Sequence, residues 1–214
     1  MKTWSLRGLI SMAVFLFGCT SFQVGTEVNS GRRAFLIGNN EAALSYFQSA
    51  AQKDPNYVYG TALRQGIWSY VGRTEYATGK FPQAQQTLQR ALSANREEDV
   101  ARLYLGLALA RAGDRQAGLK EIEGGMRGIH DWLEYVTEAH RFSFGQFWDP
   151  RREIRSAIQG DLAMISGRDL DWKKLIADGE WLGKQIEEEG DRARDDETRE
   201  RSRDGGRSDS PGSN

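Results

Sequence analysis

The sequence predicts an all-α protein, with about three pairs of helices in a short repeat stack, a helical cap at the carboxyl end and a charged tail. The prediction depends first on residues 65–98, where apolar residues recur at helical spacing on both sides of Gly79. It depends secondly on a copy of that segment further along the chain. Leu105–Gly106 stand in the copy where Val71–Gly72 stand in the original, and Gly113 follows Gly79 by 34 residues. A fixed period of this size indicates repeated helical hairpins.

The amino-terminal residues 1–18 are typical of a signal peptide. Lys2 and Arg7 precede an apolar run over residues 9–17 that is too short to cross a bilayer as a helix. The run ends in Leu16–Phe17–Gly18–Cys19, and Cys19 is the only cysteine of the chain. A plain signal peptide with a chance cysteine, or an uncleaved membrane anchor, would be the simpler interpretation.

This segment resembles the lipobox of bacterial lipoproteins, with Phe17 bulkier than the family pattern. The resemblance implies cleavage before Cys19 and attachment of lipid, including a fatty acyl chain such as palmitate, to that residue. Residues 19–27 would then be a lipidated amino terminus with a short linker. Thr20 follows the cysteine. In this it resembles lipoproteins that are exported to the outer membrane, which implies a protein that faces the periplasm.

Residues 28–128 resemble tetratricopeptide repeats. The family pattern has a bulky residue, a large–small pair, a turn glycine, and then small, large and small positions. In the middle unit these are Trp68, Val71–Gly72, Gly79, Ala84, Leu88 and Ala91. The first unit matches at Gly38, Ala43, Phe47, Ala50 and Asp54–Pro55, but has Ser30–Gly31 at the pair. The third unit keeps Leu105–Gly106, Gly113 and Ile122, with Gly118 and Gly125 at the small positions. An amphipathic helical bundle without true repeats is the alternative.

Two features of the sequence depart from a regular repeat. Gly79 follows Gly38 by 41 residues rather than 34, so a longer helix or loop is expected between the first two units. The glycine-rich residues 123–128 are expected to end or loosen the last helix of the third unit.

Residues 129–186 are expected to form capping helices. A segment from Asp131 to about Arg141 has helical spacing, and Asp149–Pro150 predicts the start of a further helix that Gly167 ends. A second start is expected at Asp169 or Asp171. The aromatic residues between 142 and 148 either plug the end of the stack or form an exposed patch for a partner, and the plug is favoured.

Residues 187–214 form a charged tail with ten acids and six arginines. Apolar residues stop at Ile186, so the tail is expected to be largely disordered, although its first part could continue the preceding helix.

The sequence contains no catalytic or nucleotide-binding motif of the common types, which predicts a protein that is not an enzyme and has no cofactor. His130 and His140 are ten residues apart, about 15 Å along one helix, so a single metal ion could not bridge them. No metal site is therefore expected. The net charge of −1 gives no basic field for nucleic acid.

The repeat resemblance implies a groove lined by the first helix of each unit, which receives a peptide or protein partner. The positions carried over are Arg32, Phe35, Leu36, Ser69, Arg73, Tyr76, Ala77, Leu103, Leu107, Ala110 and Arg111, here called the groove positions. Arginines among apolar groups could hold acidic side chains or a terminal carboxylate. The alternative is that these arginines only solvate the surface or pair with neighbouring acids.

The function expected from these features is that of an outer-membrane lipoprotein acting as a protein-binding adaptor or assembly factor in the bacterial envelope. An accessory subunit that captures a small solute between the repeats and the cap is the alternative. A closed cavity lined by Trp132, Phe144 or Trp148 would favour that alternative.

Overall fold

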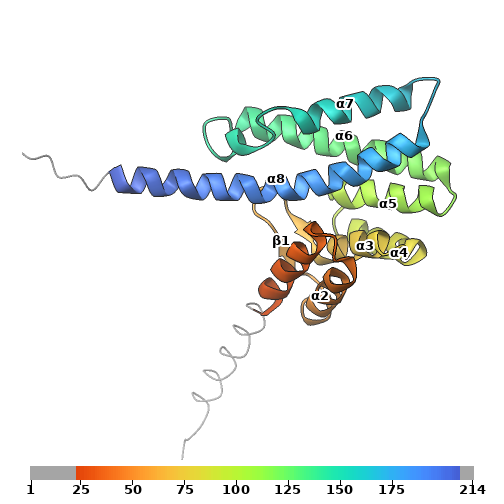
Figure 1. Cartoon of the computed structure of the whole chain (residues 1–214), viewed down its shortest axis with the longest axis horizontal. Helices are drawn as coiled ribbons and strands as arrows, with labels where there is room; N and C mark the ends of the chain where they lie inside the picture. The colour runs from red at the N-terminus through yellow and green to blue at the C-terminus, as the bar shows by residue number, and fades with distance from the viewer. Residues whose placement is uncertain (1–22, 208–214) are drawn as a thin grey trace, which may run out of the picture. The chain divides into compact units, whose positions relative to one another are not determined.

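A computed structural model describes residues 23–207 of the chain, without the side chains of residues 197 and 200–207. The signal peptide and Cys19 lie outside the described residues. Helices dominate, which confirms the all-α fold class (Figure 1). After a helix over residues 23–36 come α2 Asn40–Lys53, β1 Val58–Tyr59, β2 Gln65–Gly66, α3 Ile67–Ala77, α4 Phe81–Ala94, α5 Asp99–Arg111, α6 Arg115–Ala139, the 3-10 helix η1 Phe144–Phe147, α7 Glu153–Ser166 and α8 Trp172–Arg207.

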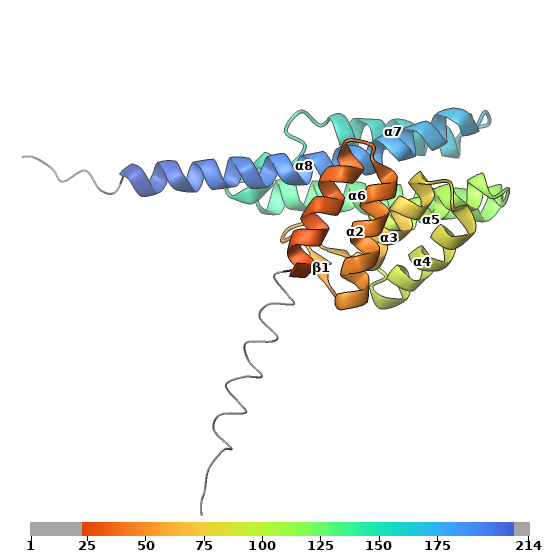
Figure 2. The same ribbon diagram turned by 60° about the horizontal axis from the view of Figure 1, so that its bottom comes forward.

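The chain divides into two compact units, Met1–Ala101 and Arg102–Asn214, with the boundary inside α5. Within the described part of unit 1, the 23–36 helix lies beside α2, and α3 lies beside α4 (Figure 2). Val24, Val28, Phe47 and Tyr70 belong to its buried core. In unit 2, α6 packs against α7 and η1, and α8 packs against α7 and η1.

Three helix pairs turn on a glycine in the left-handed conformation. Gly38, Gly79 and Gly113 have φ values of +80°, +76° and +104°, which a residue with a Cβ rarely adopts. The amide of the residue after each glycine donates to the carbonyl five residues earlier, at 2.8, 2.9 and 3.0 Å respectively. This is the Schellman arrangement that satisfies the last carbonyls of a helix. The predicted turn glycines are therefore confirmed at all three places.

The same three pairs share one close contact between their helices. A Cβ at Gly31, Gly72 or Gly106 would lie within 2.7 Å of the residue 16 positions later, which is Phe47, Leu88 and Ile122 respectively. Only glycine lets the two helices approach this closely. Gly31 therefore fills the small position of the first unit, where the sequence match was poor.

A two-stranded hairpin accounts for the extra spacing between the first two pairs. β1 pairs antiparallel with β2, with Val58 opposite Gly66 and Tyr59 opposite Gln65. Gly60, at φ +94°, lies in the connecting turn. The sequence predicted an insertion here but not strands, because segments this short show no alternation of apolar residues.

The glycine-rich segment 123–128 does not end a helix, contrary to the expectation. α6 runs without a break from Arg115 to Ala139, so the separate helix expected from Asp131 is its second half. Gly118 and Gly125 are buried on the face of α6 that also carries Ile122 and Met126. A Cβ at Gly118 would lie 2.8 Å from the Gly106 carbonyl oxygen. The burial of this face thus outweighs the low helix propensity of glycine.

The helix predicted to start at Asp149–Pro150 starts three residues later, at Glu153. Asp149 still caps it, but from the preceding turn: its carboxylate accepts the amides of Ile154 at 3.0 Å and Arg155 at 3.2 Å. Asp149 and Arg152 both have positive φ, so the turn is tight and the N-cap residue is Arg152. The other predicted start is confirmed, because Asp171 accepts the Lys174 amide at 3.0 Å.

α8 continues to Arg207, beyond Ile186 where the capping helices were expected to end. Ala193 is still buried, and ion pairs three residues apart join Arg192 to Glu189 and Arg199 to Asp196. Such pairs stabilise a helix that has few apolar contacts. The helical continuation therefore extends well into the predicted tail, and residues 208–214 lie outside the described part.

Candidate functional site

Two of the groove positions of unit 1, Arg32 and Arg73, are buried and contact the chain's own β hairpin, whereas Ala77 is exposed. Arg32 Nη1 donates to the Tyr59 hydroxyl at 2.6 Å, and its guanidinium lies 4.4 Å from the centre of the Tyr59 ring. Arg73 Nη1 donates to Gln65 Oε1 at 2.7 Å. Tyr59 and Gln65 form one of the two residue pairs that face each other across the strands. One strand pair therefore holds both arginines.

Arg73 is almost completely buried, with 1 % of its surface exposed. Its guanidinium lies 5.3 Å from the Phe35 ring centre and 5.4 Å from the Tyr70 ring centre, so aromatic faces surround it. Ser69 and Tyr76 on the same helix are also buried. The side chains predicted to bind a partner's acids in unit 1 are thus part of the packed interior.

Glu98 supplies a negative charge to this interior. Its Oε1 accepts the Gly66 amide at 3.1 Å, which ties the end of β2 to the residue just before α5. Burial raises the pKa of Glu98, while the Gly66 amide, the Ser69 hydroxyl and the positive charge of Arg73 lower it. Glu98 was not among the predicted site residues, because nothing in its local sequence indicates burial.

The groove positions of unit 2 are covered by α8. Leu103 and Leu107 have no exposed surface, and a Cβ at Gly179 of α8 would lie 3.0 Å from Leu107 Cδ2 and 3.5 Å from Leu103 Cδ1. Arg111, at the end of α5, is exposed and donates to Glu180 Oε1 at 2.9 Å. The structure thus brings three predicted site residues together on α5, where they contact a helix of the same chain.

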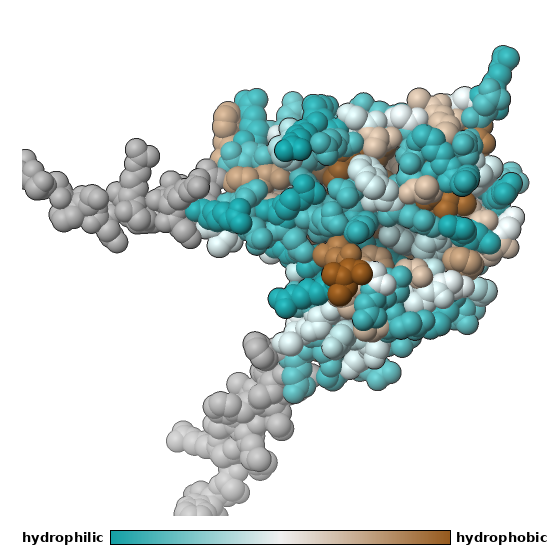
Figure 3. Space-filling view, viewed as in Figure 1, coloured by the Kyte–Doolittle hydropathy of each residue, from teal (hydrophilic) through white to brown (hydrophobic). Residues whose placement is uncertain are grey.

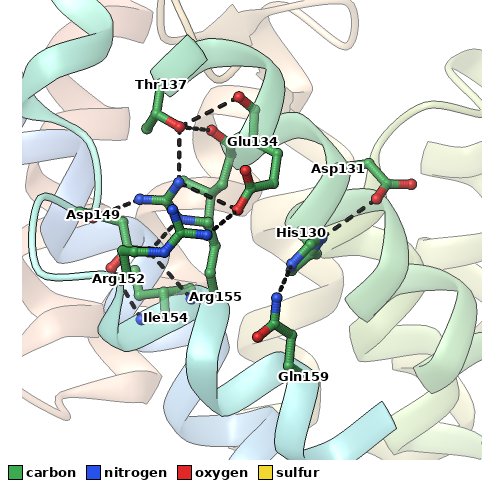
Figure 4. A network of polar contacts seen from close by, with 10 residues as sticks. His130, Asp131, Glu134, Thr137, Asp149, Arg152, Ile154, Arg155 and Gln159 are labelled. Atoms are coloured by element: carbon green, nitrogen blue, oxygen red, sulfur yellow. Dashed lines mark hydrogen bonds and ion pairs between the residues drawn. The ribbon is translucent and has the colours of Figure 1, made fainter. Parts of the chain in front are cut away.

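A second polar cluster joins α6 to α7 (Figure 4). Arg155 Nε donates to Asp149 Oδ2 at 2.8 Å in a buried ion pair, and Arg155 Nη1 donates to Thr137 Oγ1 at 2.8 Å. Arg152 donates to Glu134 at 2.8 Å. The side chains of the cluster point toward one another, so they fix the turn before α7. Sequence reasoning missed this cluster, since its members come from segments up to 21 residues apart.

The carboxylate of Glu189 extends the cluster to α8. Its Oε1 accepts the amide of Asp149 at 2.7 Å. Burial raises the pKa of Glu189, as do the charges of Asp149 and Glu153, whereas the hydrogen bond from the amide and Arg192 lower it. Glu189 therefore fastens α8 to the turn before α7.

The two histidines have separate surroundings. His130 lies 3.4 Å from Asp131 Oδ1 through Nδ1 and 3.0 Å from Gln159 through Nε2, as Figure 4 shows. His140 stacks on Phe144, with ring centres 4.4 Å apart. Among the side chains that the structure describes, no group of three or more His, Cys, Asp or Glu residues is placed to hold a metal ion.

The aromatic residues between 142 and 148 divide between two roles. Trp148 is buried, packs edge-to-face on Trp132 with ring centres 4.7 Å apart, and lies 3.3 Å from the Cβ position of Gly190. Phe142 is 86 % exposed, with the Arg141 guanidinium 4.7 Å from its ring centre. Trp148 is therefore packed between α6 and α8, whereas Phe142 belongs to the exposed surface, and the plug of a repeat stack stays a prediction. The solute-binding alternative stays a prediction.

The face that Figure 3 shows is largely hydrophilic, with hydrophobic residues in small separate areas of which the most prominent lies near the centre of the view. Ile37, in the turn before α2, is 81 % exposed. Over residues 23–207, no helix is both long enough and apolar enough to cross a membrane. A comparison of the chain with protein-family models, curated proteins and solved structures found no match.

Proposed function

We propose that the protein is a protein-binding adaptor of the bacterial envelope, held at the outer membrane by lipid on Cys19 and facing the periplasm. The observation that carries the proposal is the glycine contact repeated in three helical hairpins, always 16 residues from its large partner. Hairpins that repeat one contact form stacks, and such stacks serve mainly to present surface to other proteins. Three matching hairpins also favour the tetratricopeptide type of repeat over an irregular bundle.

The lipid anchor would hold the protein at the membrane, and it would not determine which partner the protein binds. A tethered binding module meets partners at the membrane at a high effective concentration, so modest affinity suffices. A partner such as an envelope enzyme or a secretion or pilus component would be recruited in this way. The exposed apolar residues Ile37 and Phe142 give the two units accessible contact points of the kind that interfaces use.

Photo-crosslinking in intact cells tests this proposal. A photoreactive phenylalanine analogue is placed at Ile37 or Phe142, and at the exposed Lys120 of α6 as a matched control. We expect adducts with one envelope protein at Ile37 or Phe142, fewer of them in Cys19→Ser, and saturable binding when the two proteins are purified. Adducts no more abundant than at Lys120 would contradict the proposal.

A labelling experiment tests the anchor separately. Cells fed radiolabelled palmitate should incorporate it into the wild-type protein and not into Cys19→Ser. Equal labelling of both proteins, or of neither, would contradict lipidation at Cys19.

A further inference from the structure

α8 contacts α5 through two glycines that are four residues apart. A Cβ at Gly183 would lie 2.3 Å from Tyr104 Cε2, and one at Gly179 would lie 3.0 Å from Leu107 Cδ2. Both glycines therefore leave room for side chains of α5 that a larger residue would displace. Since residues four apart lie on one side of a helix, the two glycines form a single flat contact surface.

Large apolar side chains flank these glycines on the same side of α8. Leu175, Leu182 and Ile186 are buried, and they lie four residues before Gly179, three after it and three after Gly183. This spacing is the pattern of an amphipathic helix lying on an apolar surface. The α5 face thus accommodates a helix with large residues around a small-residue centre.

An ion pair at the edge adds chemical selectivity. Arg111 at the end of α5 pairs with Glu180, the residue after the first glycine, at 2.9 Å, and both side chains are more than one-third exposed. An exposed pair adds little stability, but it rejects a helix that carries a positive charge at this position. The α5 face therefore distinguishes helices by charge as well as by shape.

We infer that the α5 face formed by Leu103, Tyr104, Leu107 and Arg111 is a binding site for a partner's amphipathic helix with the pattern small–acid–x–x–small, and that α8 occupies this site in cis. The inference rests on the proposed function and names the partner chemistry of one of its surfaces. A helix of this pattern on another protein competes with α8 for the same contacts.

Competition from α8 is strong because α8 belongs to the same chain. Only residues 167–171 join it to α7, so its effective concentration at α5 is on the order of millimolar or higher. An external helix of equal intrinsic affinity therefore binds weakly. Its apparent affinity is the intrinsic affinity multiplied by the fraction of molecules in which α8 has left α5. The covered state is the resting state of the site.

The test measures binding of a fluorescein-labelled peptide of residues 172–190 to the purified full chain by fluorescence anisotropy. In the variant Gly183→Leu, the leucine clashes with Tyr104 and loosens α8. We expect this variant to bind the peptide at least tenfold more tightly than the wild-type chain does. The matched control is Gly160→Leu in α7, where a Cβ meets nothing within 4 Å, and it should bind as the wild type does.

Folding of Gly183→Leu is checked by circular dichroism, and a charge exchange decides the matter if that variant unfolds. The chain variant Arg111→Glu should prefer a peptide carrying Glu180→Arg over the native peptide by severalfold. Failure of a folded Gly183→Leu variant to bind the peptide, or equal binding of both peptides by Arg111→Glu, would overturn the inference.

The probe is the chain's own helix, so this result is independent of the crosslinking experiment. Peptide binding without an envelope adduct would leave the site established and the adaptor function contradicted. An envelope adduct without peptide binding would support the adaptor function and contradict the helix-binding site on α5.

Discussion

The two units cover the predicted groove positions by different means. In unit 1, two short strands cover Arg32 and Arg73, and the partners of both arginines lie opposite each other in the strand pair. In unit 2, the long helix α8 covers Leu103 and Leu107, and its pair with Arg111 remains exposed. Predicted groove positions are thus covered in unit 1 by a β hairpin and in unit 2 by a long helix.

The difference concerns how easily each cover can be removed. The strand pair holds an arginine that is almost completely buried, so lifting it would take the hydrogen bond to Gln65 away from a buried charge. The contacts of α8 with α5 are apolar apart from an exposed ion pair, and another helix could replace them; the buried Glu189 fastens α8 separately, to the turn before α7. We conclude that the unit 1 cover is part of the fold, whereas the unit 2 cover is exchangeable.

The largest expected effect comes from the buried ion pair of unit 2. Asp149→Ala leaves the guanidinium of Arg155 buried and two amides without an acceptor, so we expect a loss of about 3–5 kcal/mol in the free energy of unfolding. Urea denaturation, with hydrogen exchange to separate the units, measures it. The exposed Asp169→Ala is the control, and a loss below about 1 kcal/mol for Asp149→Ala would contradict the assigned role.

The glycine contacts give the next effect and compare the units directly. A Cβ at Gly106 would lie 2.5 Å from the backbone nitrogen of Ile122, whereas one at Gly72 would meet first the side chain of Leu88. A backbone atom cannot rotate away as a side chain can. We therefore expect Gly106→Ala to lower the free energy of unfolding by about 3 kcal/mol and Gly72→Ala to lower it by about 1 kcal/mol.

The control for these substitutions is Gly160→Ala, at an exposed position of α7 with open space around it. It should stabilise the protein by about 0.5–1 kcal/mol through helix propensity. Thermal unfolding followed by circular dichroism ranks the three variants. An order with Gly160→Ala as the most destabilising would show that the close contacts are not formed.

A pH dependence is expected in unit 2. Burial, and then the neighbouring carboxylate of Asp178, raise the pKa of Asp161 from 3.8 to about 6, while Lys174 lowers it. The folded protein therefore binds this proton between about pH 4 and 6 while the unfolded chain has released it, so stability falls as the pH rises through this window.

Asp161→Asn removes that titration. The stability of this variant relative to the wild type should be greater at pH 7.5 than at pH 5, as measured by urea denaturation at the two values. The exposed Asp169→Asn provides the control. If the free energies of unfolding of the variant and the wild type differ by the same amount at both pH values, the raised pKa of Asp161 is contradicted.

The smallest expected effect concerns the ion pair between Arg111 and Glu180. Arg111→Gln should cost less than about 1 kcal/mol of stability, because both side chains are well exposed. A much larger loss in urea denaturation would indicate that α8 is held as firmly as the strand pair, and would contradict the contrast between the two covers.

The repeating parts of the fold could be predicted from the sequence, because local rules determine them. The turn glycine, such as Gly79, and the small residue that faces a large one, such as Gly72 with Leu88, recur at fixed distances in the sequence. The covers could not be predicted, since contacts between distant residues create them. Nothing near Tyr59 indicates a partner at Arg32, and nothing near Gly183 indicates Tyr104.

The same limit explains the errors at helix ends. The glycines in 123–128 were expected to end the helix because of their low helix propensity, but burial of one face of α6 outweighs that propensity. Asp149–Pro150 has the composition of a helix start, and the capping function of Asp149 was predicted correctly. Its position was wrong, because the hydrogen bond with Arg155 and the left-handed backbone at Arg152 delay the helix.

Hydrogen exchange of the full chain, measured by mass spectrometry, tests the contrast between the covers most directly. Gly183→Leu should lose protection together in α5 and in residues 172–190 of α8, while β1, β2 and α3 keep the protection they have in the wild type. Unchanged protection of α5 in this variant, or an equal loss in the β hairpin of unit 1, would contradict the account.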